Sequence, residues 1–185
     1  MNIVLFSKDQ GVREHWLSKL NSLDFTHYNG VISCTSYKEL GNAIEDKNHI
    51  LLYHLLAGDA QEKICYQFIS KYQQQHKMIV FVNAPDASQG LRIFRSGIHG
   101  YSNTFLDQKK LLIAIDVIEQ GKVWIGSKIL AKLLKDCGLD EKVEHKSTNK
   151  ESIQKETAEA PQQEIKTNLL GSLVKGFKKL FSKYA

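Results

Sequence analysis

Short apolar runs alternate with longer amphipathic stretches over the first 135 residues. Apolar residues dominate four runs, as expected of strands buried on both faces of a parallel sheet. These runs are Ile3–Phe6, Val31–Cys34, Ile50–Tyr53 and Met78–Val82, and a fifth, short strand is expected around Gly100–Tyr101. In the stretches that follow the runs, apolar residues recur at three- and four-residue spacing, which predicts five helices.

Several residues predict where these elements begin and end. Asn83-Ala84-Pro85 ends the fourth run, and Ser96-Gly97 ends the helix that follows it. Asp107 suits the N-cap of the next helix, and Gly121 suits its end. Five strands that alternate with five helices predict an α/β fold with a doubly wound, five-stranded parallel sheet of the flavodoxin-like kind. In such a sheet the working site lies beyond the carboxyl ends of the strands.

The composition excludes several classes of protein. The 185 residues are 42% hydrophobic and 24% charged, with only two prolines, which is typical of a globular chain. No apolar run approaches the roughly 20 residues that span a bilayer, and the opening MNIVLFSKDQ does not resemble a signal peptide. The three cysteines form no CxxC pair, so we expect no disulfide framework and a cytoplasmic location.

The net charge of +5 is unevenly distributed and divides the chain into three parts. Residues 1–135 carry 16 basic and 12 acidic side chains, whereas residues 136–164 carry 4 and 8. Residues 165–185 carry five lysines and no acid. Because residues 136–164 contain no aromatic residue and many Glu, Lys, Gln, Ser and Thr, we interpret them as a flexible acidic linker between a domain and a basic helix.

The last third of the domain resembles a known family. The segment Leu91–Trp124, LRIFRSGIHGYSNTFLDQKKLLIAIDVIEQGKVW, is similar in spacing and residue type to the end of the receiver domain of NarL/LuxR-type response regulators. VRE at Val12–Glu14 also matches the first helix of that family. The resemblance covers about residues 1–135 and implies the receiver variant of the flavodoxin-like fold. The helix-turn-helix domain of the family has no counterpart here, so we expect no sequence-specific binding of nucleic acid.

The resemblance also implies where a phosphorylation pocket would lie. The family uses an acid pair after the first strand to hold magnesium, an acceptor aspartate at the end of the third, a hydroxyl after the fourth and a lysine after the fifth. Aligning the matched segments places different residues at all of these positions: Ser7, Lys8, Tyr53, Val82 and Thr104, with Asp9 next to the acid pair. A lysine repels the dication, and a phenol is a far weaker nucleophile than a carboxylate at neutral pH. We therefore expect a degenerate receiver that does not autophosphorylate.

Other chemistry has little support in the sequence. The seven histidines form no HxxxH or HExxH pair, and neither a GxGxxG, a GxxxxGK[ST] nor a GxSxG motif occurs. We therefore expect no metal, no cofactor and no enzymatic activity. An active receiver would require an acceptor near residue 53, and the nearest downstream aspartate is Asp59.

The segment 165–185 is predicted to form a basic amphipathic helix. Its apolar residues recur at helical spacing and share one broad face, while lysines lie on or flank the opposite face, which is typical of a helix at a membrane surface. The helix is defined by Leu169, Leu170, Leu173, Val174, Phe177, Leu180 and Phe181, with Lys175, Lys178 and Lys179. GSLVKGFKKLF in particular resembles the C-terminal membrane-targeting helices of bacterial cell-division proteins.

Two functions are consistent with these features. The first is a signalling adaptor that binds partner proteins, or a second copy of itself, through its receiver-like domain. Its C-terminal helix would hold it peripherally at the anionic lipid surface of the inner membrane. The second is a soluble two-component or transcription-linked regulator whose C-terminal helix docks on a protein partner. In the receivers that this chain resembles, the fourth helix, the fifth strand and the fifth helix form the face that binds partners. In this sequence that face includes Arg92, Arg95, Tyr101 and Lys109. Docking of the C-terminal helix on its own domain is a third possibility for that segment.

Overall fold

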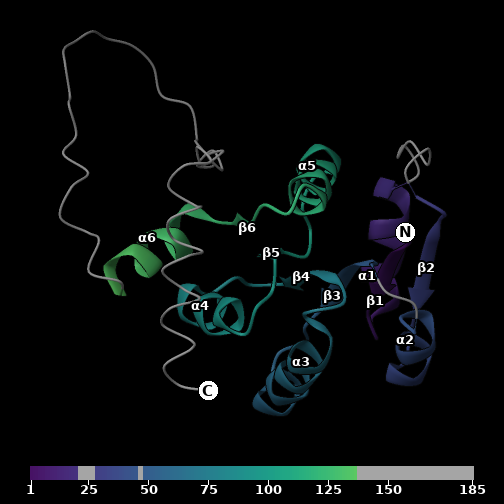
Figure 1. The fold of residues 1–185 in the computed structure, drawn as a ribbon, viewed down its shortest axis with the longest axis horizontal. Coiled ribbons are helices and arrows are strands. Elements are labelled where there is room, and N and C mark those ends of the chain that lie inside the picture. The colour runs from purple at the N-terminus through teal and green to yellow at the C-terminus, as the bar shows by residue number, and fades with distance from the viewer. Residues whose placement is uncertain (21–27, 46–47, 137–185) are drawn as a thin grey trace, which may run out of the picture. The chain divides into compact units, whose positions relative to one another are not determined.

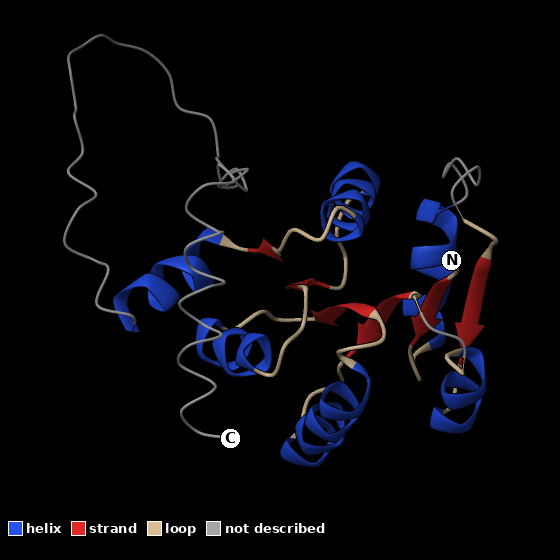
Figure 2. Ribbon diagram, in the orientation of Figure 1, coloured by secondary structure: helices blue, strands red, loops and turns tan. Residues whose placement is uncertain are grey.

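The computed structural model describes residues 1–20, 28–45 and 48–136, so the predicted linker beyond Asp136 and the predicted helix over 165–185 lie outside the described residues. All strands are parallel and form one sheet in the order β2-β1-β3-β4-β5-β6 (Figures 1 and 2). The strands are β1 (Ile3–Phe6), β2 (Val31–Cys34), β3 (Ile50–His54), β4 (Lys77–Val82), β5 (Gly100–Asn103) and β6 (Trp124–Ile125). The helices are α1 (Gln10–Leu20), α2 (Tyr37–Ala43), α3 (Asp59–Tyr72), α4 (Ala87–Arg95), α5 (Gln108–Glu119) and α6 (Ser127–Asp136).

The α/β fold class predicted from the sequence is confirmed, with one strand and one helix more than expected. Asp107 caps α5 by accepting a hydrogen bond from the Lys110 amide at 2.8 Å. Gly97 and Gly121 follow α4 and α5 with φ of 95° and 73°, the left-handed conformation that favours glycine at helix ends. The two-residue strand β6 and the helix α6 then extend the sheet and the helical layer beyond the predicted last helix.

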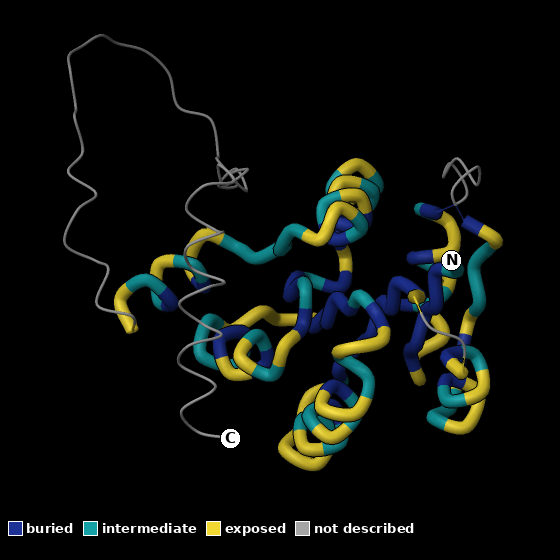
Figure 3. Tube along the Cα trace, viewed as in Figure 1, coloured by how far each residue is buried: buried dark blue, intermediate teal, exposed yellow. Residues whose placement is uncertain are grey.

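The helices lie on both faces of the sheet, with α1 and α5 on one face and α2, α3 and α4 on the other (Figure 1). The inner strands β1, β3, β4 and β5 are almost wholly buried between them, whereas the edge strands β2 and β6 are partly exposed (Figure 3). On the first face Trp16 of α1 is fully buried, with its ring centroid 5.0 Å from that of Phe81 on β4. None of the described helices combines the length and the apolar character that a membrane-crossing segment requires.

Aromatic side chains fill the second face near α2 and α3. Tyr53 of β3 is 1% exposed, and its ring centroid lies 5.0 Å from that of Phe6 and 5.5 Å from that of Phe68. Its hydroxyl forms a 3.0 Å hydrogen bond with the hydroxyl of Tyr37. Burial is the largest cause of the strongly raised pKa of Tyr53, so its phenol stays protonated.

Helix α6 packs against α4. Gly90 of α4 makes this close approach possible, because a Cβ atom there would lie 2.7 Å from Cδ1 of Ile129 on α6 and 2.8 Å from Cε1 of Tyr101. At the end of α6 the guanidinium of Arg95 pairs with the carboxylate of Asp136 at 2.9 Å. Residues 127–136 therefore form part of the packed domain.

Candidate functional site

The loops that follow β1, β3, β4 and β5 meet at one edge of the sheet. Because parallel strands end on the same side, Ser7, His54, Asn83 and Thr104 lie at this carboxyl edge. Ser7 is fully buried, and Thr104 and His54 are 1% and 2% exposed. This is the place where the sequence predicts a degenerate phosphorylation pocket.

A continuous hydrogen-bond network joins three of these loops. The hydroxyl of Ser7 lies 2.8 Å from Nδ1 of His54, and Nε2 of His54 lies 3.1 Å from Oδ1 of Asn83. Since the Asn83 carbonyl oxygen only accepts, Nε2 carries the proton, and Nδ1 accepts from Ser7. The amide of Asp9 donates to the Ser7 hydroxyl at 3.0 Å. Burial lowers the pKa of His54, so all members of the network are uncharged at neutral pH.

The network continues to the loop after β5. The side-chain amide of Asn103 donates to the main-chain oxygen of Asn83 at 3.1 Å, and its Oδ1 accepts from the Phe105 amide at 2.7 Å. The indole of Trp16 donates to the main-chain oxygen of Thr104 at 3.0 Å. The loops are thus fixed to one another by the chain's own side chains.

The residue that joins the network from the end of β3 is His54, whereas the sequence predicts Tyr53 at this place. Successive side chains of a strand point to opposite faces, so a shift of one residue exchanges the pocket side for the α2–α3 side. The Tyr53 hydroxyl pairs with that of Tyr37 on that side, whereas the Ser7 hydroxyl bonds to His54 and to the Asp9 amide. The prediction for Tyr53 was wrong, and it missed His54 and Asn83, because the run ILLYH is buried throughout and shows no alternation.

The charged residues near the first strand are engaged with other parts of the domain. Lys8 extends away to place its ammonium 5.0 Å from the ring centroid of Tyr37. Oδ1 of Asp9 accepts from the Val12 amide at 3.2 Å and so acts at the start of α1. The guanidinium of Arg13 donates to the main-chain oxygen of Ser7 at 2.7 Å, which adds a cation where a dication would bind.

The two other residues predicted for the pocket, Val82 and Thr104, make no side-chain hydrogen bond among the described residues. Val82 is 5% exposed and has no hydroxyl to donate, while its main-chain oxygen accepts from the Thr104 amide at 2.9 Å. The Thr104 hydroxyl is buried and has no hydrogen-bond partner among the described residues. Ser7, Asp9, Val82 and Thr104 therefore lie together at the carboxyl edge, whereas the Lys8 and Tyr53 side chains are directed toward Tyr37.

The arrangement holds the loops of the carboxyl edge together. Ser7, His54 and Asn83 have the connectivity of a nucleophile, a base and an orienting residue. A nucleophile must reach a substrate, and the Ser7 side chain is fully buried. Over the described ranges, no group of three or more His, Cys, Asp or Glu side chains could hold a metal ion.

The predicted partner face is partly occupied from within the chain. Arg92 pairs with Glu62 of α3 at 3.0 Å, and Arg95 pairs with Asp136 of α6. Tyr101, expected on an exposed surface, is only 1% exposed, and its hydroxyl donates to Gln89 at 2.9 Å. That expectation was wrong for Tyr101, because its buried ring packs against Gly90 of α4. Lys109 is exposed on α5.

No protein-family profile and no curated protein matches the sequence. Solved structures do match. The response regulator DrrB of Thermotoga maritima, an OmpR/PhoB homologue, is 18% identical with a TM-score of 0.52, over 66% of this chain and 54% of that one. The isolated REC domain of RcsB from Salmonella enterica serovar Typhimurium, solved with phosphomimetic BeF3-, is 14% identical with a TM-score of 0.54, over 70% and 96%. A LuxR-family two-component response regulator from Aurantimonas sp. is 15% identical with a TM-score of 0.53, over 74% and 97%.

These similarities identify the fold as that of response-regulator receiver domains, which confirms the expectation drawn from LRIFRSGIHGY and VRE. The chain spans about half of DrrB and nearly all of the isolated RcsB REC domain. The shared part is therefore the receiver-type sheet with its helices.

Proposed function

We propose that this chain is a non-enzymatic signalling adaptor that works without phosphorylation. Its receiver-type domain binds partner proteins, and residues 165–185 hold it at the anionic surface of the inner membrane. The observation that carries the first part is the uncharged network of Ser7, His54 and Asn83 at the edge where a receiver would hold magnesium and an acceptor carboxylate.

Electrostatics support independence from phosphorylation. Magnesium binding relies on carboxylate oxygens, and the nearest acid, Asp9, is engaged with the first turn of α1. Arg13 and Lys8 add positive charge beside the same loop, which opposes a dication. A phosphoryl group bound to His54 would break the hydrogen bonds to Ser7 or Asn83 and leave a buried polar group unpaired.

Incubation with acetyl phosphate and magnesium is expected to leave the chain unphosphorylated. Intact-mass spectrometry measures incorporation, with a phosphorylatable receiver as the positive control. Incorporation that disappears in Asp9→Asn or Asp59→Asn would contradict the proposal and identify an active acceptor. Incorporation that persists in both variants and disappears in His54→Asn would contradict it equally.

The membrane part of the proposal rests on the sequence alone. Five lysines near an anionic leaflet contribute about 1 kcal/mol each, and insertion of the apolar face of residues 165–185 adds to this. Ordering about twenty residues opposes binding by a comparable amount. The balance favours reversible rather than permanent attachment.

Vesicles that contain anionic lipid are expected to co-sediment the full chain but not residues 1–164. Leu173→Asp with Phe177→Asp should reduce binding at least tenfold, because two charges then enter the apolar face. Asn168→Asp with Ser182→Asp is the matched control, since it changes the net charge equally but lies on the polar face and should bind more strongly than the first pair. Added salt should weaken binding of the full chain.

A failure to bind vesicles of any composition would refute the membrane part. The second candidate would then hold, in which residues 165–185 dock on a protein partner of a soluble regulator. The amphipathic pattern favours that alternative as well, because an apolar helical face also fits a protein groove. Under this alternative, Leu173→Asp with Phe177→Asp should again bind more weakly than Asn168→Asp with Ser182→Asp. The quantity measured is then binding to the protein partner instead of binding to vesicles.

A further inference from the structure

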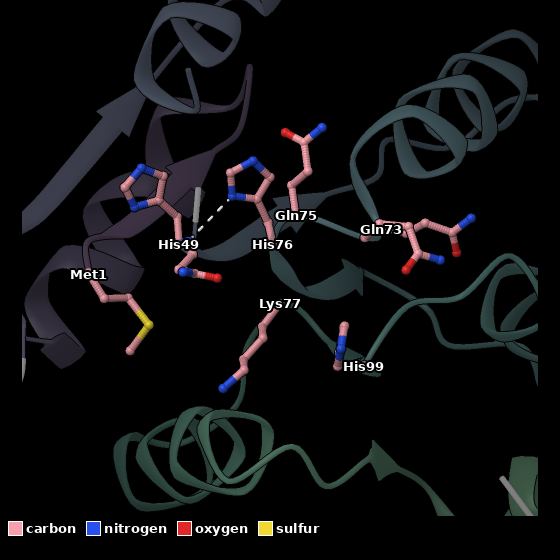
Figure 4. A pocket seen from close by; sticks show the side chains of 9 residues that line it. Met1, His49, Gln73, Gln75, His76, Lys77 and His99 are labelled. Atoms are coloured by element: carbon pink, nitrogen blue, oxygen red, sulfur yellow. Dashed lines mark hydrogen bonds between the residues drawn. The ribbon is translucent and has the colours of Figure 1, made fainter. Parts of the chain in front are cut away.

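A cavity opens at the other edge of the sheet, near the amino ends of β3, β4 and β5, away from the Ser7–His54–Asn83 network. Its volume is about 250 Å³. His49, His76 and His99 line it together with Lys77, Gln73 and Gln75 (Figure 4). Met1, Asn48 and Gln74 complete the lining. None of these nine residues is acidic.

The three histidines share one hydrogen-bonding arrangement. Nδ1 of His49 accepts from the Asn2 amide at 3.2 Å, Nδ1 of His76 from the His49 amide at 3.3 Å, and Nδ1 of His99 from the Met78 amide at 3.3 Å. Each Nδ1 is thus an acceptor, which fixes the proton of the neutral ring on Nε2. Nε2 of His76 is buried, whereas the partly exposed His99 lines the cavity and can offer its N–H group there.

Positive charge at this edge is not balanced by acids. The ring centroids of His49 and His76 lie 5.5 Å apart in a stacked arrangement. The pKa of His76 is lowered first by burial and second by the neighbouring His49. Burial and the neighbouring Lys77 lower the pKa of His99. At the end of α5 the main-chain oxygen of Glu119 accepts from Lys77, while its carboxylate accepts from the Tyr28 hydroxyl.

We propose that this cavity binds a small oxyanion, such as phosphate, sulfate or a carboxylate, together with a proton. The N–H group of His99, the Lys77 ammonium and the glutamine amides of the lining are donors of the kind that recognise such an anion. The bound anion supplies the missing negative charge, so it favours the protonated form of His99 and is held more tightly as the pH falls. The site is separate from the carboxyl edge and does not depend on the adaptor function proposed above.

Sulfate is the first probe, because its charge is constant between pH 5.5 and 8, so any pH dependence of its binding comes from the protein. Histidine NMR signals of the full chain should shift saturably with sulfate at constant ionic strength. The dissociation constant is expected to rise about tenfold per pH unit above the histidine pKa if one proton is taken up. Phosphate and acetate in parallel titrations distinguish a general oxyanion site from one selective for phosphate-like groups.

His99→Asn is the matched variant, since its Oδ1 can still accept from the Met78 amide while the outward N–H and the titrating ring are lost. It should abolish the pH dependence and weaken sulfate binding at pH 6 at least tenfold, as should Lys77→Met. His15→Asn, a histidine outside the cavity, should bind sulfate as the wild type does. Linear, unsaturable shifts, or equal affinity in the His99 and His15 variants, would overturn the proposal.

Discussion

Trp16→Ala is expected to lower the free energy of unfolding by about 3–5 kcal/mol, the usual range for removing a fully buried tryptophan. The loss has two sources. The cavity would open between α1 and β4, where the indole packs on Phe81. The main-chain oxygen of Thr104 would lose its donor at 3.0 Å. Urea denaturation of the full chain measures the change.

Trp16→Phe separates the two contributions. It keeps most of the ring and removes the N–H, so we expect a smaller loss of about 1–3 kcal/mol from the unpaired Thr104 oxygen and the reduced volume. Leu17→Ala, on the next residue of α1 and 36% exposed, should cost less than either substitution. Equal destabilisation by Trp16→Ala and Leu17→Ala would contradict the role of Trp16 in joining α1 to the loop after β5.

Acidification is expected to destabilise the domain well above the pH at which carboxylates titrate. Burial is the first cause of the lowered pKa values of His54, His76 and His99. Above about pH 6.5, the pKa of histidine in the unfolded chain, these histidines are deprotonated in both the folded and the unfolded state, and they do not reduce the stability of the fold. Below it the unfolded chain takes up protons that the folded chain does not, so stability falls as the pH decreases through this window and toward the lowered values.

The slope can be bounded. Each histidine contributes at most about 1.4 kcal/mol per pH unit, less for the partly exposed His99, so the slope for the three together stays below about 4 kcal/mol per pH unit. Unfolding free energies at pH 8, 7, 6 and 5.5 measure it. The slope should decrease in His99→Asn and in His76→Asn, whose new side chains preserve the Nδ1 acceptor position. A stability that is constant from pH 8 to 5.5 would contradict the prediction.

Periodicity and helix caps were enough to predict the fold. The continuous apolar runs and signals such as Asp107 and Gly121 are local, and the structure has them where the sequence indicates. The strand β6 escaped prediction because two residues, Trp124 and Ile125, cannot show a period. Helix α6 has apolar residues at helical spacing, Ile129 and Leu133, both buried, but its partner on α4 is set by Gly90, whose importance appears only in three dimensions.

The site was harder to predict than the fold. The general place, the carboxyl edge, follows from the chain topology, and Ser7 and Thr104 lie there. The choice between Tyr53 and His54 depends on which side chain faces α1, and a strand buried on both faces contains no polar alternation that reveals it. The cluster of His49, His76 and His99 was also missed, because these residues are 23 or more positions apart and meet only when three strands align.

Both margins of the sheet are short. Strand β2 offers four residues at one side, and β6 offers two at the other. A sheet that exposes so few unpaired main-chain groups has little tendency to add a strand from another molecule, which protects it from edge-to-edge aggregation. A partner is therefore not expected to bind this domain by adding a strand to its sheet. A protein selected for binding to this domain should contact its helices instead.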